Sequence, residues 1–206
     1  MKEKNQNILR ALIAVALSLC VALLSVWAVV TEKADINLAI NVGKASSFAR
    51  VTRFNTYSNG KVQDSFDNYV SEFGGRFGEY GTATLRENIL SLNRLRVDDR
   101  VDFVIEFTDK SSVDIQYRVV LECANDYYGM YEGLKVKVGS NYLDTTEYEC
   151  SYIDGQPAPI ESEWAMFPKG RDFDRIFVTV MLPQEGSAYS GRGTQLSVSV
   201  HVIPHT

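Results

Sequence analysis

The chain has 206 residues, a formal net charge of −5 and two histidines. A mildly acidic chain with only a loose group of cations at 94–100 provides no basic footprint for nucleic acid. His201 and His205 are too few for a histidine-rich zinc centre, and the sequence has no His-Glu-x-x-His motif. Nucleic-acid binding and histidine-based zinc chemistry are therefore excluded as first hypotheses.

The N-terminus has the pattern of a membrane-targeting segment. A basic start within residues 1–10 precedes an uncharged, apolar stretch at 11–30. The positive start favours the cytoplasmic side, and about 20 apolar residues are enough to span a bilayer. Because Ala28 is the small residue that signal peptidase requires, we expect cleavage between Ala28 and Val29, with an uncleaved membrane anchor as the alternative. Either outcome predicts export, with the protein secreted or held at the cell surface.

The rest of the chain, 31–206, has the length of one domain, after a signal peptide or transmembrane anchor at 1–30. Alternating apolar and polar residues predict strands there. The strands are expected at 36–42, 101–107, 113–121, 134–138, 148–152, 164–167, 176–182 and 196–202. Turn-forming residues at 108–112 predict that the strands on either side form an antiparallel hairpin.

One segment favours a helix. Phe66, Tyr69, Val70 and Phe73 have helical spacing before the pair Gly74-Gly75, whereas 85–92 fits either a helix or a strand. About eight or nine short strands with almost no helix predict an all-β fold, an antiparallel β-sandwich of jelly-roll type.

The exported part contains two cysteines, Cys123 and Cys150, since Cys20 lies in the apolar stretch. They can form a disulfide, which would stabilise the fold by about 3–4 kcal/mol if the two Cα atoms lie close enough. The alternative is a pair of buried free thiols.

Catalytic residues are not predicted. No serine lies in a Gly-x-Ser-x-Gly motif, and Asp98-Asp99 is typical of a turn rather than of a calcium site. We therefore expect no enzyme activity, no metal site and no cofactor.

Aromatic residues form the candidate binding surface. Tyr127, Tyr128 and Tyr131 could stack on sugars or contact a protein partner, and the loop 73–80 is a second candidate. The alternative is that these rings only cover apolar surface.

Three short stretches carry a resemblance to a known family. They are Ala28-Val29-Val30-Thr31-Glu32, the segment Leu95–Phe103, and the C-terminal Leu182-Pro183-Gln184-Glu185 followed by Tyr189-Ser190-Gly191-Arg192. They resemble the junction, the turn and the ending of TasA/camelysin-like proteins, which are Gram-positive surface and biofilm-matrix proteins with a SipW-type signal peptide. The proline and glycine of the family's turn are absent here.

The resemblance implies a non-enzymatic jelly-roll protein of the cell surface or extracellular matrix. Its partners would be further copies of itself or other matrix proteins, besides signal peptidase and the membrane during export. We expect the segment 29–42 to donate a strand to a neighbouring subunit, since an open sheet edge accepts an added strand. The alternative function is a monomeric surface module that binds glycans or proteins.

Overall fold

The computed structural model describes residues 39–41, 47–67, 72–110, 112–126 and 129–205. These residues form two packed β-sheets and very little helix, so the predicted fold class, an all-β antiparallel sandwich of jelly-roll type, is confirmed. The segment predicted to target the membrane, 1–30, lies outside the described residues. Among the residues that are described, no helix is both long and apolar enough to pass through a bilayer.

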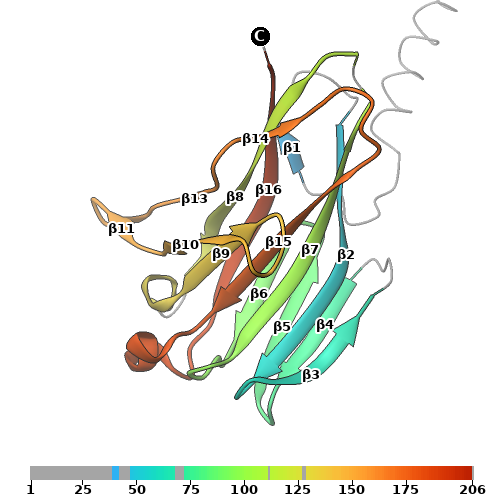
Figure 1. The fold of residues 1–206 in the computed structure, drawn as a ribbon. Coiled ribbons are helices and arrows are strands. Elements are labelled where there is room, and N and C mark those ends of the chain that lie inside the picture. The colour runs from blue at the N-terminus through green and yellow to red at the C-terminus, as the bar shows by residue number, and fades with distance from the viewer. Residues whose placement is uncertain (1–38, 42–46, 68–71, 111, 127–128, 206) are drawn as a thin grey trace, which may run out of the picture. The chain divides into compact units, whose positions relative to one another are not determined.

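A six-stranded sheet forms one layer of the sandwich and has the order β10-β9-β15-β7-β2-β3 (Figure 1). Every neighbouring pair in it is antiparallel. Its strands are β2 (Ser47–Ser58), β3 (Lys61–Phe66), β7 (Arg100–Asp109), β9 (Lys135–Gly139), β10 (Thr145–Glu149) and β15 (Asp174–Met181). The long strands β2, β7 and β15 therefore lie side by side and form a broad face.

An eight-stranded sheet forms the other layer, in the order β13-β8-β16-β6-β5-β4, with β1 beside β16 and β14 beside β8. Its strands are β1 (Ala39–Asn41), β4 (Glu72–Phe77), β5 (Gly81–Arg86), β6 (Ile89–Asn93), β8 (Ile115–Asn125), β13 (Ile160–Glu161), β14 (Ala165–Phe167) and β16 (Thr194–Pro204). Strand β1 is the parallel one, running with 199–201 of β16.

Smaller elements complete the described chain. They are the hairpin of β11 (Tyr152–Ile153) and β12 (Gln156–Pro157) and the 3-10 helices η1 (Tyr131–Gly133) and η2 (Gln184–Tyr189). The strands outnumber the eight or nine that were expected because β2, β3, β4 and β5 were not predicted and because several others are only two or three residues long.

The hydrophobic core fills the space between the two sheets. Phe54 and Phe73 stack across it with ring centroids 5.5 Å apart, and Phe107, Tyr117 and Phe167 form an aromatic cluster with centroids 4.7–6.5 Å apart. Alternation along each strand directs one set of side chains inward and the other set outward. Because the inner faces are used for packing, a ligand has to bind to an outer face, an edge or a loop.

The predicted helix around 66–73 is wrong. Phe66 ends strand β3, and Phe73 belongs to strand β4 and is fully buried, while Tyr69 and Val70 lie outside the described residues. The rings of Phe66 and Phe73 meet edge to face at 6.5 Å, so two strands bring them together. Helical spacing over so few residues did not distinguish this arrangement from a helix.

The predicted hairpin between 101–107 and 113–121 is also wrong, although both segments are strands. β7 pairs with β2 and β15 in the six-stranded sheet, whereas β8 pairs with β16 in the other sheet. The connection between them crosses the sandwich. Alternation shows which face of a strand is buried, but it does not specify the neighbouring strand.

Candidate functional site: the outer face of the six-stranded sheet

Four rows of side chains cross the outer face of the six-stranded sheet. The register of β2, β7 and β15 aligns one residue from each strand in every row. The rows are Arg50-Glu106-Arg175, Arg53-Val104-Phe177, Asn55-Asp102-Thr179 and Tyr57-Arg100-Met181. Strand β9 extends the last two rows with Lys137 and Lys135. We call this surface the charged face.

A β-bulge in β2 makes two of these rows possible. The register with β7 shifts between Val51 and Arg53, so Thr52 is an extra residue. Val51 and Phe54 both remain in the core, and Arg50 and Arg53 both face outward although they are three residues apart. The bulge therefore adds a second arginine to the charged face.

Ion pairs hold the two arginines that β2 contributes to the first two rows. Arg50 donates hydrogen bonds from Nε and Nη2 to Oε1 of Glu106, at 3.2 and 2.5 Å. Arg53 donates from Nε to Oδ1 of Asp67 at 2.6 Å, and this bond raises the pKa of the guanidinium. Glu106 is only 8% exposed, so a charged carboxylate lies almost buried in the middle of an outer face.

Asp102 occupies the centre of the third row and is 3% exposed. It accepts a hydrogen bond from Oγ1 of Thr179 at 2.8 Å and pairs with Nη2 of Arg100 at 3.3 Å. Burial raises the pKa of its carboxyl above the ordinary value, while Thr179 and Arg100 act in the opposite direction. The neighbouring side chains therefore shield the Asp102 carboxyl group from water, and Thr179 and Arg100 supply its polar contacts.

Aromatic rings lie among these charges. Tyr142, in the loop between β9 and β10, contacts the ring of Phe177 edge to face with centroids 4.4 Å apart. Tyr142 therefore reaches from the β9–β10 loop to strand β15. The guanidinium of Arg100 lies over the ring of Tyr57 at 4.0 Å.

The β9–β10 loop is built to place Tyr142. Oδ1 of Asn141 accepts hydrogen bonds from the backbone N–H groups of Leu143 and Asp144, at 2.8 and 2.9 Å, which closes a tight turn. A Cβ atom at Gly139 would lie 1.9 Å from the carbonyl oxygen of Asp144, so only glycine allows the chain to return this closely. Tyr142 is 41% exposed and Leu143 is 99% exposed.

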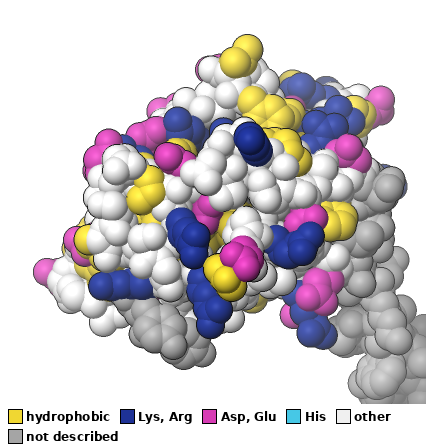
Figure 2. All heavy atoms as spheres, turned by 90° about the horizontal axis from the view of Figure 1, so that it is seen from below, with side chains coloured by type: hydrophobic (Ala, Val, Ile, Leu, Met, Phe, Trp, Pro, Cys, Tyr) yellow, Lys and Arg dark blue, Asp and Glu magenta, His cyan; other side chains and the backbone are white. Residues whose placement is uncertain are grey.

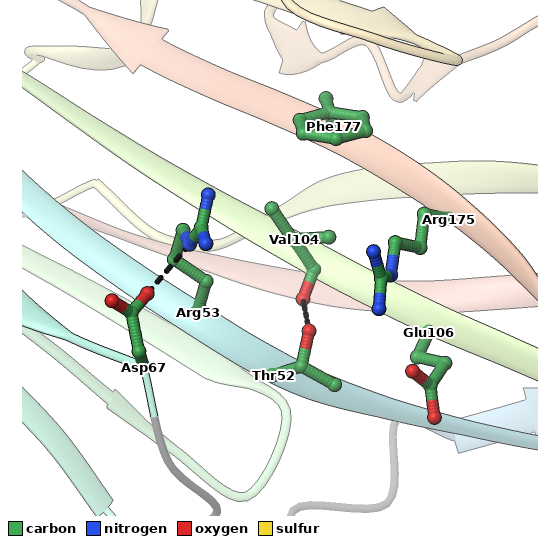
Figure 3. Close-up of a pocket in the computed structure, with 7 residues that line it drawn as sticks. All are labelled: Thr52, Arg53, Asp67, Val104, Glu106, Arg175 and Phe177. Atoms are coloured by element: carbon green, nitrogen blue, oxygen red, sulfur yellow. Dashed lines mark hydrogen bonds and ion pairs between the residues drawn. The ribbon is translucent and has the colours of Figure 1, made fainter.

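Two open cavities lie on the charged face. The first has a volume of about 210 Å³, and Figure 3 shows Arg53 and Arg175 on opposite sides of Val104 within it. The second has a volume of about 380 Å³. The first is lined by Thr52, Arg53, Asp67, Val104, Glu106, Arg175 and Phe177, and the second by Tyr57, Arg100, Asp102, Lys137, Tyr142, Thr179 and Met181. We call them the arginine cavity and the tyrosine cavity.

The tyrosines predicted to bind a ligand do not form a surface platform in the described part of the chain. Tyr131 is fully buried, and its hydroxyl donates a hydrogen bond to the carbonyl oxygen of Ala158 at 2.5 Å. Tyr127 and Tyr128 lie outside the described residues, as do Ala28 and Val29 of the predicted cleavage site. In the second predicted loop, Phe73 is core, and Tyr80 is 53% exposed.

The two cysteines of the domain are free thiols in the structure, Cys123 half-buried and Cys150 buried. Burial raises the pKa of the Cys150 thiol to about 12, so at neutral pH it is protonated and a weak nucleophile. The disulfide stays a prediction. Among the described residues, no group of three histidine, cysteine or acidic side chains could hold a metal ion.

The end of the sandwich seen in Figure 2 carries cations and carboxylates that are interspersed, with apolar atoms between them. No large area of one sign is visible on this side. A surface with mixed charges does not provide the continuous field that steers a strongly charged polymer.

The charged face escaped the sequence analysis because only the inward residues of each strand were considered. Asp102, Glu106 and Arg175 are the outward residues of two strands that were correctly predicted. The sequence feature that could have indicated this face is the presence of charged residues in the middle of a long predicted strand. Tyr57 was missed because strand β2 was not predicted.

No protein-family model matches the chain, and a comparison with curated proteins finds no match. Solved structures that it resembles include a fucose binding module from Streptococcus pneumoniae, with 9% identity, a TM-score of 0.31 and coverage of 57% of this chain and 70% of that one. A carbohydrate binding module, CBM29-2, solved with mannohexaose, has 15% identity, a TM-score of 0.25 and coverage of 74% and 92%. The tailspike protein 4 of bacteriophage CBA120 has 11% identity and a TM-score of 0.33, with coverage of 75% of this chain but only 19% of the tailspike. Likenesses this low transfer neither a ligand nor an activity.

Proposed function

We propose that the protein is a non-catalytic, exported binding module that holds a glycan on the charged face. The observation that carries this proposal is the combination of aromatic rings and pre-ordered polar groups around two open cavities of one sheet face. Sugar rings offer apolar C–H faces that pack on aromatic side chains, and hydroxyl groups that bond to carboxylates and guanidinium groups. Tyr57, Tyr142 and Phe177 supply the first kind of contact, and Arg53 and Arg100 the second.

Pre-ordering of the polar groups supports binding. Glu106 and Asp102 are held by Arg50, Arg100 and Thr179 before any ligand arrives. Side chains that are already fixed lose less conformational freedom when a ligand binds, so more of the contact energy contributes to affinity.

Spacing argues against glycosidase chemistry on this face. Glu106 and Asp102 are four residues apart on one strand, which separates them by about 13 Å. Hydrolysis of a glycosidic bond uses two carboxyl groups about 5–9.5 Å apart. Asp102 and Glu106 are therefore too far apart to act together in the hydrolysis of a glycosidic bond.

The test compares two neighbouring substitutions in the same loop. Tyr142→Ala removes a ring that bounds the tyrosine cavity, and Leu143→Ala removes an almost fully exposed side chain beside it. Full-length protein, purified in a detergent without sugar headgroups, is applied to a glycan array, and binding to the best ligand is measured by calorimetry. We expect Tyr142→Ala to weaken binding by about tenfold, as loss of an aromatic contact does, and Leu143→Ala to bind as wild type. Absence of any glycan ligand, or equal binding by both variants, contradicts the proposal.

Self-assembly by strand donation is the second candidate function, as the family resemblance implies. The observation that favours it is the short parallel pairing of β1 with 199–201 of β16, a slot that an equivalent strand from another copy could also fill. Light scattering of the wild-type protein and of a variant lacking 29–42 tests it. Assembly that grows with concentration and is lost in the deletion supports the idea, whereas a monomer at every concentration contradicts it.

A further inference from the structure

Arg175 differs from the other cations of the charged face. Arg50, Arg53, Arg100, Lys135 and Lys137 each pair with a carboxylate at 2.5–3.3 Å. Within the described part of the chain, no carboxylate lies within ion-pair distance of the Arg175 guanidinium, although the side chain lines the arginine cavity. Its positive charge is therefore available to a ligand.

The nearest carboxylate in the register is already occupied. Glu106 lies directly across the strand pair from Arg175, but its Oε1 accepts both hydrogen bonds from Arg50 on the other side. Four charged residues line the arginine cavity, namely Arg53, Arg175, Glu106 and Asp67, and Arg50 lies beside Glu106 in the first row. Three arginines and two carboxylates give this group one net positive charge. Figure 3 shows Arg53 and Arg175 flanking the same floor residue, Val104.

The guanidinium of Arg175 is a group that suits a planar anion. It lies over the ring of Phe173, with its central carbon 5.1 Å from the ring centroid, and guanidinium N–H groups lie in the plane of the group. A carboxylate can accept two parallel hydrogen bonds from such an edge, which is a stronger and more specific contact than a single hydroxyl makes. Phe177 adds an apolar wall to the same cavity.

We infer that the arginine cavity binds the carboxylate of an acidic sugar, with Arg175 as the residue that selects it. The cavity is open and has a volume of about 210 Å³, with both a cation and an apolar side chain in its lining. The apolar face of the ring would pack against Phe177 and its carboxylate would pair with Arg175. This inference rests on the proposed glycan-binding function and adds the class of sugar.

The test uses two acidic sugars with matched neutral partners. Trigalacturonate is compared with its carboxyl-reduced form, and sialyllactose with lactose, so that a hexuronate and a sialic acid are distinguished. Calorimetry on full-length wild-type protein should show at least one acidic sugar binding about tenfold or more tightly than its neutral partner. The preference should weaken between about 50 and 500 mM NaCl, since salt screens the contact.

Two variants identify the residue responsible. Arg175→Gln should abolish the preference, so that the variant binds the acidic sugar and its neutral partner with affinities within about twofold of each other, because the group that pairs with the carboxylate is gone. Arg171→Gln is the matched control: Arg171 pairs with Asp174 and does not line the cavity, so the preference should persist.

The outcomes separate this inference from the proposed function. If neutral and acidic partners bind equally, or if Arg175→Gln keeps the preference, the acidic-sugar inference is wrong and glycan binding stands. If no saccharide of either kind binds here or on the glycan array, both are wrong.

Discussion

The two outer faces of the sandwich are built from different side chains. On the eight-stranded sheet, the outward residues of β5, β6 and β16 include several short hydroxyl side chains, among them Thr84, Ser91 and Ser197. On the charged face the corresponding positions carry arginine, glutamate, aspartate and aromatic residues. The long side chains of the charged face bury the carboxyl groups of Glu106 and Asp102 almost completely.

The difference shows how one fold separates stability from binding. Both inner faces are consumed by the core, so the outer faces are free to vary. The charged face uses this freedom to hold polar groups in fixed positions at the cost of desolvating them, an arrangement typical of functional surfaces. The predictions below test whether the two outer faces differ in energy as well as in composition.

Breaking one ion pair on each face should give the largest contrast. Glu106→Ala removes the carboxylate that accepts two hydrogen bonds from Arg50 and lies between Arg50 and Arg175, so we expect a loss of about 2 kcal/mol in the free energy of unfolding. The matched change on the other face is Glu161→Ala, which breaks a pair with Arg118. The glutamate side chain there is 42% exposed, against 11% for Glu106, so its loss should be below about 1 kcal/mol.

Urea denaturation of both variants measures the contrast. Glu106→Gln, which keeps an oxygen acceptor, should lose less stability than Glu106→Ala. Equal losses for Glu106→Ala and Glu161→Ala would show that burial on the charged face has no energetic consequence.

The sequence allowed the architecture to be predicted better than the site. Strands β7, β15 and β16 were predicted from their inward residues, because burial imposes a period of two. The partners of β7, the bulge at Thr52 and the strand β2 were not predicted, since they depend on contacts between distant parts of the chain. The four rows exist only through this register, so the charged face could not be assembled from local patterns.

The pH dependence of stability should distinguish the buried Asp102 from an exposed carboxylate. Burial raises its pKa in the folded protein above the unfolded value, which is about 4. The folded state therefore binds this proton more tightly, and the resulting stability is present below about pH 4 and is lost as the pH rises through the folded pKa.

Asp102→Asn removes this titration. We expect the difference in free energy of unfolding, variant minus wild type, to be larger at pH 7 than at pH 4, because only the wild-type protein loses stability as this carboxyl group ionises. Urea denaturation at the two pH values measures it. A difference between the two proteins that is the same at both pH values would show that Asp102 does not titrate differently on folding.

The smallest effect should come from the hydroxyl-rich face. Ser91→Ala removes an acceptor for the side-chain amide of Gln195, a hydrogen bond of 3.2 Å at a half-buried position. Since water can replace this partner, we expect a loss of about 0.5 kcal/mol in the free energy of unfolding. Glycan affinity should match that of wild type because Ser91 lies on the opposite sheet from both cavities. A Ser91→Ala variant that loses affinity as strongly as Tyr142→Ala would move the binding surface to the eight-stranded sheet, and equal tolerance of both changes would place it on neither face.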